Sequence, residues 1–362
     1  MRELRMKGGF AFALKNYRAA FIAAFFFGCI APGTKLLVHN LPPQSTAGIL
    51  YFFAGIGMLA ILLAKKELLP SLAHIKPKDG KWLFAATLFG GILGPAFLTY
   101  GLLSIRGSTA SLLLNLESVL TSLIAWFVFK EHFEKKIVWG MLFIISGCVI
   151  LSWSAQASGG QDSLTGVSLI ALACLSWGID NNVTRNIAHL NPVLTASIKG
   201  VIAGSSNLAL GFLIGERFGL NIQILQAGLL GFLGIGVSLV AFIISLGTIG
   251  TARTGAVFST APFVGAILSV LVLGEAVSIP FILALVLMGF GVMCHLSEEH
   301  LHEHSHPALE HSHEHAHDEH HQHAHDADDP PGTTHNHKHR HVAETHQHRH
   351  FPDIHHLHEH EQ

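Results

Sequence analysis

The sequence predicts an all-α integral membrane protein: ten transmembrane helices form two inverted five-helix repeats, and a disordered tail follows them. Three observations predict this fold class. Half of the 362 residues are hydrophobic and only 13% are Asp, Glu, Lys or Arg, about half the charged share of a soluble domain. Apolar stretches of ~17–25 residues, the length that crosses a bilayer as a helix, follow one another through residues 19–296. After residue 297 the composition changes to histidine and acidic residues.

The expected spans share this length and carry few charges. They are residues 19–39, 46–64, 82–102, 107–129, 137–155, 165–187, 193–214, 225–247, 251–273 and 279–296. They define a short N-terminal segment (1–18), a first repeat (19–155), a second repeat (165–296) and the tail (298–362). The connections are short, and the prolines at 42, 43 and 192 suit helix ends or first turns.

The internal repeat is visible as a shifted match. Residues 106–131 recur 144 positions later as residues 250–275, and both stretches begin with small residues and end at a glutamate, Glu131 or Glu275. The start of each half matches at an offset of 150, through the pairs Phe27-Gly28 and Trp177-Gly178, Thr34-Lys35 and Thr184-Arg185, His39 and His189, and Pro42 and Pro192. Five spans per half is an odd number, so the halves must be inverted, with a substrate site between them near the midplane.

The distribution of Lys and Arg predicts the orientation. These residues concentrate in the N-terminal segment and in the loops after the second and fourth spans, while the alternate loops of the first half carry only Arg106. Because positively charged loops stay inside, the N-terminus is expected in the cytoplasm. Ten spans then place the C-terminus there as well, in a multi-pass protein of the cell membrane.

Several short motifs occur in a characteristic order. They are Lys35 with Leu41-Pro42-Pro43 behind it, Ser108-Thr109-Ala110-Ser111, the span-ending Glu131 and Glu275, and Gly147 and Gly291 in the last span of each half. With the 5+5 layout, this order resembles the EamA-like permeases of the drug/metabolite transporter superfamily. The resemblance implies a secondary exporter or exchanger of small metabolites with both termini in the cytoplasm. Glu117 departs from it, because many relatives have a proline or small residue there.

Glu117 is the leading candidate for transport chemistry, because it lies near the centre of the fourth expected span. A carboxylate at that depth costs ~2.5–3.5 kcal/mol on insertion scales, so it should face protein or water. It can serve as a proton relay or as a counter-charge for a cationic substrate. Alternatively, it forms a fixed ion pair with Lys35 or Lys199, the cations available in or near spans.

Asp180, Asn181 and Asn182 form a second candidate cluster inside the sixth expected span. Consecutive polar side chains there indicate a cavity lining or an opened helix, unless the span ends at this point. Lys199 lies deep enough to hold an anionic substrate group. Lys35 and Arg185 are better explained by side chains that reach the interface, and His39 and His189 by interfacial packing.

Small residues recur at a spacing of four, as Gly90 and Gly94 in the third span and Gly200 and Gly204 in the seventh. This spacing is typical of close helix contacts. Pro95 directly follows Gly94 and is expected to kink its helix. Packing is the simpler explanation of both pairs, and a mobile gate is the alternative.

The tail contains 23 of the 28 histidines, mostly as HxH repeats. With few apolar residues it cannot bury a core, so we expect disorder. Imidazole is a common ligand for zinc, nickel, cobalt and copper. The metal-ligating candidates are His300, His302, His304, His306, His311, His313, His315, His317, His335, His337, His339 and His341. A cytoplasmic tail of this kind can buffer metal, sense it or hand it to the pore, and incidental binding is the alternative.

Three functions are compatible with these features. The first is a secondary transporter of a small solute, the second a transition-metal efflux permease fed by the tail, and the third a membrane-anchored metal buffer or sensor. No enzyme is expected, and no GxxxxGK[ST] loop indicates ATP as the energy source. Transport requires no cofactor, although the tail is expected to bind a divalent transition metal. The expected partners are the lipid bilayer and a small-molecule or ion substrate, without nucleic acid, and the oligomeric state is open.

Overall fold

The computed structural model describes residues 17–130, 135–157, 162–219, 221–249, 251–296, 300–306, 309–315, 335–341 and 344–350. It divides into two units, Met1–Ser297, here called the membrane unit, and Glu298–Gln362, the tail unit. Glu131 and His317 of the sequence prediction lie outside the described residues.

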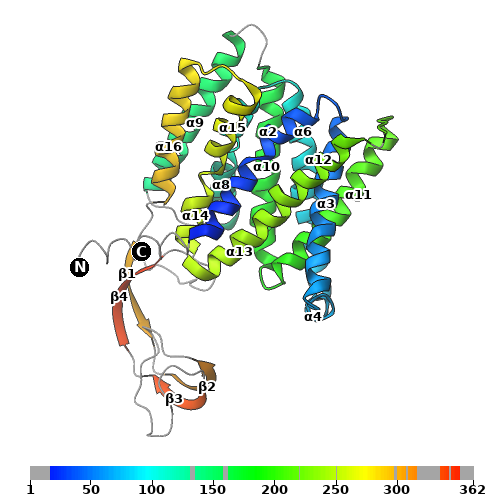
Figure 1. The fold of residues 1–362 in the computed structure, drawn as a ribbon. Helices are drawn as coiled ribbons and strands as arrows, with labels where there is room; N and C mark the ends of the chain where they lie inside the picture. Colours follow the sequence, from blue (N-terminus) through cyan, green and yellow to red (C-terminus); the bar gives the residue numbers. More distant parts are fainter. Residues whose placement is uncertain are drawn as a thin grey trace, which may run out of the picture. The chain divides into compact units, whose positions relative to one another are not determined.

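The membrane unit is helical wherever regular structure is described (Figure 1). After helical residues 17–28, its elements are α2 (Ile30–Leu37), α3 (Pro43–Ala64), α4 (Leu68–Ala73), η1 (Pro77–Asp79), α5 (Gly80–Ala86), η2 (Thr87–Leu93), α6 (Gly94–Leu103), α7 (Gly107–Leu113), α8 (Leu116–Phe129), α9 (Lys135–Ala157), α10 (Leu164–Thr184), η3 (Arg185–Ile187), α11 (Pro192–Leu213), α12 (Ile222–Gly231), η4 (Phe232–Val237), α13 (Ser238–Ile249), α14 (Thr251–Phe258), α15 (Ala261–Leu273) and α16 (Ile279–Leu296).

Nine helical stretches among the described residues are long and apolar enough to cross a membrane. They are Tyr17–Leu37, Pro43–Ala64, Pro77–Leu103, Gly107–Val128, Lys135–Trp153, Leu164–Ile187, Pro192–Leu213, Ile222–Leu246 and Arg253–Leu273. These match the first nine expected spans, so the sequence prediction is confirmed for them. The tenth coincides with α16, whose apolar part Ile279–Cys294 is shorter, and as a membrane span it stays a prediction.

The helices pair in a regular way. At one edge of the membrane unit α9 packs against α16, and at the opposite edge α3 packs against α11 (Figure 1). Between these edges, α10 contacts α6 and α8, while α2 contacts α12 and α15. This arrangement places α10, which carries the second candidate cluster, among the first-half helices.

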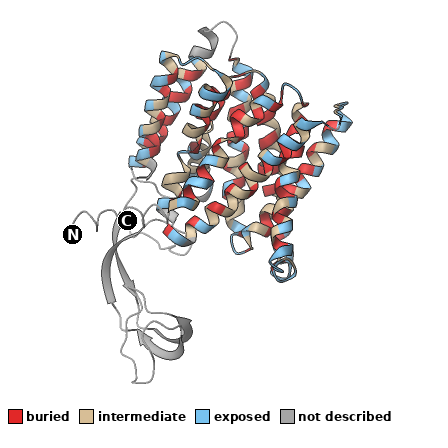
Figure 2. Cartoon of the chain, in the orientation of Figure 1, coloured by how far each residue is buried: buried red, intermediate tan, exposed pale blue. Residues whose placement is uncertain are grey.

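The contact between α3 and α11 depends on glycine. A Cβ atom at Gly200 would lie 2.6 Å from Cα of Gly55, and one at Gly204 would overlap the backbone of Phe52. The two helices therefore approach backbone to backbone, as the spacing of four predicts. Figure 2 shows buried residues on faces between helices and exposed ones on outward faces. Large apolar side chains such as Leu213 and Trp153 are 82% and 76% exposed.

Pro95 lies just after the irregular segment of the third span. It has no N–H group, so the carbonyls that would accept from it inside a helix need other donors. The preceding residues form the π-helical segment η2, in which the N–H of Gly94 donates to Phe89 O. Two side chains, Tyr51 and Trp177, donate to Gly90 O at 3.0 and 3.1 Å. Asn207 from α11 donates to Gly91 O at 3.1 Å, so neighbouring helices satisfy the segment.

The described part of the tail unit forms two antiparallel two-stranded sheets. β1 (His300–His306) pairs with β4 (Glu344–His350), and β2 (Leu309–His315) pairs with β3 (His335–His341). The prediction of disorder is therefore wrong for these four segments. The HxH alternation has the period of two that suits a strand, and ladder hydrogen bonds between backbones need no buried core.

The backbone register of both sheets sets histidine opposite histidine at six positions. These pairs are His300 and His350, His302 and His348, His304 and His346, His311 and His339, His313 and His337, and His315 and His335.

Candidate functional site

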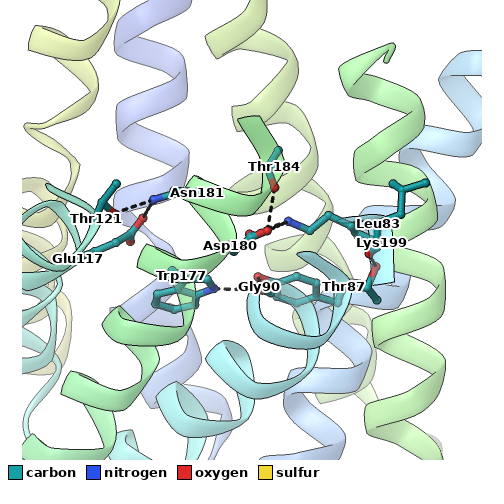
Figure 3. Close-up of polar contacts among 11 residues, drawn as sticks. Leu83, Thr87, Gly90, Glu117, Thr121, Trp177, Asp180, Asn181, Thr184 and Lys199 are labelled. Carbon is teal, nitrogen blue, oxygen red and sulfur yellow. Dashed lines mark hydrogen bonds and ion pairs between the residues drawn. The ribbon is translucent and has the colours of Figure 1, made fainter. Parts of the chain in front are cut away.

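The polar residues of α10 form the centre of a cluster that reaches three neighbouring elements. Trp177, Asp180, Asn181 and Thr184 lie on this helix within eight consecutive residues. Figure 3 shows Asn181 directed toward Glu117 and Thr121, and Asp180 directed toward Lys199 on the other side of the helix. The candidate cluster therefore lies inside the helix rather than after its end, which answers the alternative that the span ends before it.

Asp180 is fully partnered. Lys199 Nζ lies 2.7 Å from its Oδ1 and 2.6 Å from its Oδ2, and Thr184 Oγ1 donates to Oδ1 at 2.9 Å. The Lys199 and Asp180 side chains are only 16% and 11% exposed. Burial of a charge is tolerated when it is paired and hydrogen-bonded, as here. The pair thus neutralises two of the three ionisable groups of the cluster.

Glu117 on α8 has a different environment. Its Oε1 accepts a hydrogen bond from Asn181 Nδ2 at 2.9 Å, and the same nitrogen lies 3.2 Å from Thr121 Oγ1. Glu117 is partly buried, whereas Ser118 and Asn181 are exposed. Lys199 pairs with Asp180 and Lys35 lies elsewhere, so the fixed ion pair considered for Glu117 is not formed with either lysine. Its described hydrogen-bond donor is a neutral amide.

The Asn182 side chain binds backbone oxygens next to the cluster. Its Nδ2 donates to Thr121 O at 3.1 Å and to Gly178 O at 2.9 Å. It is buried at 4% exposure. The bond to Thr121 O therefore joins α10 to α8. None of the hydrogen bonds described for Asn182 involves Glu117.

Gly90 brings the η2 segment against this cluster. A Cβ atom at Gly90 would overlap the carboxylate of Asp180, and one at Gly94 would lie 2.6 Å from the indole nitrogen of Trp177. The small-residue spacing in the third span therefore serves the approach of backbone to site residues. The spacing of Gly90 and Gly94 was the signal for this approach in the sequence. Tyr51 and Thr121 carried no signal of their own, and Thr184 was noticed only as part of the internal repeat.

Lys35 is not part of the cluster. Its Nζ donates to Leu102 O at 2.5 Å, and it interacts electrostatically with Glu275 and Asp162. His189 lies 3.2 Å from Asp79, and His39 is exposed. The structure thus unites Glu117, Asp180, Asn181 and Lys199 and separates Lys35 from them.

No group of three or more His, Cys, Asp or Glu side chains that could hold a metal occurs within the described part of the membrane unit. The ligand types in the cluster are carboxylate, amide, hydroxyl and ammonium. Such groups suit a hydrogen-bonding or charged organic solute better than a soft transition metal.

An apolar, multi-span helical unit with a buried ion pair and a partly buried glutamate within its spans is typical of a membrane transporter. The chain belongs to the EamA-like transporter family, whose model matches residues 15–153 and again residues 164–297. This family lies within the drug/metabolite transporter superfamily. The same family model thus matches the chain twice, once in each half.

The relatives have transporter names. The chain is 26% identical over 286 residues to an "Uncharacterized transporter" of Methanothermobacter thermautotrophicus, covering 75% of this chain and 83% of the relative. It is 20% identical over 292 residues to one of Clostridium kluyveri, covering 78% and 93%. It is 26% identical over 162 residues to a "Probable amino-acid metabolite efflux pump" of Salmonella typhimurium, covering 44% and 49%.

A solved structure titled "Crystal structure of protein" shares the fold. Its TM-score is 0.57 at 20% identity, and the match covers 78% of this chain and 96% of that chain. At this identity the likeness concerns the helical architecture alone.

Proposed function

We propose that the protein is a secondary active transporter, an exporter or exchanger of a small hydrogen-bonding solute, and that Glu117 binds the coupling proton or a cationic group of the substrate. The observation that carries this proposal is the unequal partnering of the two carboxylates. Asp180 is matched by Lys199, whereas Glu117 is held by the neutral Asn181 amide. The cluster therefore has one unmatched negative charge when Glu117 is ionised, and this charge favours a proton or a cation.

The inverted repeat is part of the same proposal. Its support is the double family match together with the packing of the halves: α10 lies against α6 and α8 as α2 lies against α12 and α15. Two π-helical segments, η2 and η4, also end at equivalent places, since Leu93 and Val237 are 144 residues apart. Two halves of five spans each, both starting with the same motifs, fit together only if one is inverted.

The polar residues of the cluster have apolar counterparts in the other half of the repeat. At the offsets seen in the sequence, Glu117 corresponds to Ala261, Asn181 to Ala31 and Asp180 to Ile30. The counterpart region is an apolar pocket with a cavity volume of about 10 Å³, whose lining includes Ala31, Ala261 and Pro262. We infer that the charged groups of a substrate bind on the α8–α10–α11 side.

The relative from Salmonella typhimurium, a probable amino-acid metabolite efflux pump, makes amino acids the first solutes to test. An amino acid offers an ammonium group for Glu117 and a carboxylate for Lys199. It also has hydrogen-bonding groups for Asn181 and Thr121. Release of Lys199 from Asp180 during binding is the step that this assignment requires.

The tail is a second candidate function, favoured by the histidine-to-histidine register of its two sheets. Directly opposite residues of an antiparallel pair are close neighbours, and HxH repeats supply many imidazoles. We propose that the tail binds divalent transition metals. On the proposed topology, with both termini in the cytoplasm of a cell-membrane protein, it does so as a buffer beside the transporter.

Transport into everted membrane vesicles, which present the cytoplasmic face, tests these proposals. Labelled amino acids and labelled Zn²⁺, Ni²⁺ and Co²⁺ are compared with and without an imposed proton gradient. The variants are Glu117→Gln, the chain truncated after residue 297, and Glu67→Gln as matched control, because Glu67 is an exposed loop glutamate.

We expect gradient-dependent amino-acid accumulation that survives truncation and Glu67→Gln but is lost in Glu117→Gln. Metal should bind in proportion to the tail. Metal accumulation that survives truncation and fails in Glu117→Gln would instead support the efflux permease. Absence of every transport activity, with metal binding retained by the tail, would leave only the buffer or sensor.

A further inference from the structure

Glutamates of the second half bind the starts of two first-half helices. Glu275 follows α15, and its two oxygens accept from the N–H groups of Gly107 and Ser108, at 2.7 and 2.8 Å, where α7 begins. Glu216 follows α11 and accepts from the N–H groups of Gln44 and Ser45 at 3.1 and 2.7 Å, in the first turn of α3. Its Oε2 also accepts from the Ser45 hydroxyl at 2.6 Å.

A third carboxylate, Asp162, acts at the same loops. It precedes α10 and accepts from the backbone N–H of Arg106 at 2.6 Å, just before α7. The Arg106 guanidinium lies 2.6 Å from Asp162 and also donates to Ala276 O at 3.3 Å, next to Glu275. The Thr109 hydroxyl also donates to Asp162 Oδ2, at 3.0 Å.

These contacts share one physical basis. The first N–H groups of a helix have no partner inside the helix, and the helix dipole favours negative charge there. A carboxylate that accepts two such N–H groups makes charge-assisted hydrogen bonds. Here the helices belong to the first half, while the carboxylates belong to the second half or to the segment between the halves. The bonds therefore hold one half to the other.

The loops at the opposite ends of these spans are held differently. There, the described contacts between the halves include His189 with Asp79 at 3.2 Å and Asn191 with Ser71 at 3.1 Å. The N-terminus of α11 is capped by its own Asn191. In the described residues, Glu275, Glu216 and Asp162 thus bind helix starts across the halves at the end of the bundle where α3 and α7 begin. Glu131, the counterpart of Glu275 in the repeat, lies outside the described residues.

We propose that Glu275, Glu216 and Asp162 form a latch that closes one end of the transporter, and that this latch must release α3 and α7 before the site opens at that end. The proposal rests on the proposed transport function, because rocking of one repeat against the other must break such contacts. Released N–H groups and carboxylates regain water as a partner, so the closure is reversible. Lys35, near Glu275 and Asp162, belongs to this end of the bundle and not to the site.

Cysteine accessibility tests the latch. Ser118 is exposed beside Glu117, so Ser118→Cys is labelled by a membrane-impermeant maleimide added to one face of the membrane at a time. The chain without this change measures labelling of the four native cysteines. We expect Ser118→Cys to be labelled mainly from the face opposite the latch. Glu275→Gln should raise labelling from the latch face severalfold, and Glu216→Gln/Glu275→Gln should raise it further.

Glu67→Gln is the control and should leave the two-sided labelling ratio unchanged. Equal labelling from both faces of the chain with its latch intact, or no change in any latch variant, would overturn the proposal. Glu216 and Glu275 bind different helices, so Glu216→Gln carries the test if Glu275→Gln does not reach the membrane.

The same measurement separates the latch from the proposed function, because labelling requires no substrate. A labelling shift in a protein that transports no solute supports the latch and removes the transport proposal. Transport without any shift removes the latch alone.

Discussion

Asn181 Nδ2 donates to Oε1 of Glu117 at 2.9 Å and so joins α10 to α8. The residue before it, Asp180, pairs with Lys199 on α11 instead. Consecutive side chains of an α-helix point about 100° apart. Two adjacent side chains of α10 therefore contact two different helices. Any motion of α10 therefore acts on Glu117 and on the ion pair together.

The Asn181 amide is predicted to hold Glu117 in place for transport. Asn181→Leu removes the described donor, and a hydrogen bond to a charged group of this kind corresponds to about tenfold or more in an equilibrium constant. We expect transport to fall by about that factor in vesicle assays, while the protein still reaches the membrane. Asn186→Leu is the control, because the hydrogen bonds described for the Asn186 amide go to the backbone oxygens of Asn182 and Val183. Equal losses in both variants would contradict this role.

The contributions of Asp180 and Lys199 to the free energy of unfolding are predicted to depend on each other. Lys199→Met leaves a buried carboxylate without its cation, and loss of one partner of a buried pair costs about 3–5 kcal/mol of the free energy of unfolding. Asp180→Asn/Lys199→Met should cost less than Lys199→Met alone, because the unmatched charge is gone. Unfolding of the purified protein in detergent micelles measures both. Additive losses from the two changes would show that the pair is not coupled.

The sequence alone predicted nine of the spans, since a long apolar stretch is a strong local signal. It also selected Glu117, Asp180, Asn181 and Lys199, because a polar residue inside an apolar span is conspicuous. The spacing of Gly200 and Gly204 indicated a close helix contact, but it did not identify α3 as the partner.

The sequence did not predict which charged side chains pair with one another. Lys199 was available to either Glu117 or Asp180, and only the arrangement of α10 and α11 decides between them. The span-ending Glu275 was noticed as a family-like motif, but its contact with Gly107 joins residues 168 positions apart. The strands of the tail were missed because composition was weighed above the HxH alternation.

Gly90 is predicted to be indispensable to the site. Gly90→Ala places a methyl group where the Asp180 carboxylate lies, and overpacking of this kind costs about 1–3 kcal/mol. We expect both lower stability and loss of transport, because the Asp180 carboxylate cannot keep the position in which it pairs with Lys199. Gly80→Ala is the matched control, since nothing lies within 4 Å of a Cβ atom at Gly80. Full activity of Gly90→Ala would show that the site tolerates a displaced Asp180.

One hydrogen-bond donor to the Gly90 carbonyl is predicted to be enough for most of its contribution to stability. Tyr51→Phe removes the phenol that donates to it at 3.0 Å, but the indole of Trp177 still donates at 3.1 Å. The cost of Tyr51→Phe should therefore be small, about 0.5–1.5 kcal/mol. In a Trp177→Phe background the same change leaves a buried acceptor without a partner, at a cost of about 1–3 kcal/mol. Because both measurements use the same Tyr51 substitution, their difference isolates the hydrogen bond from the loss of the indole ring. Equal costs in the two backgrounds, measured by unfolding in detergent micelles, would show that another donor reaches Gly90 and that Pro95 does not commit η2 to these two side chains.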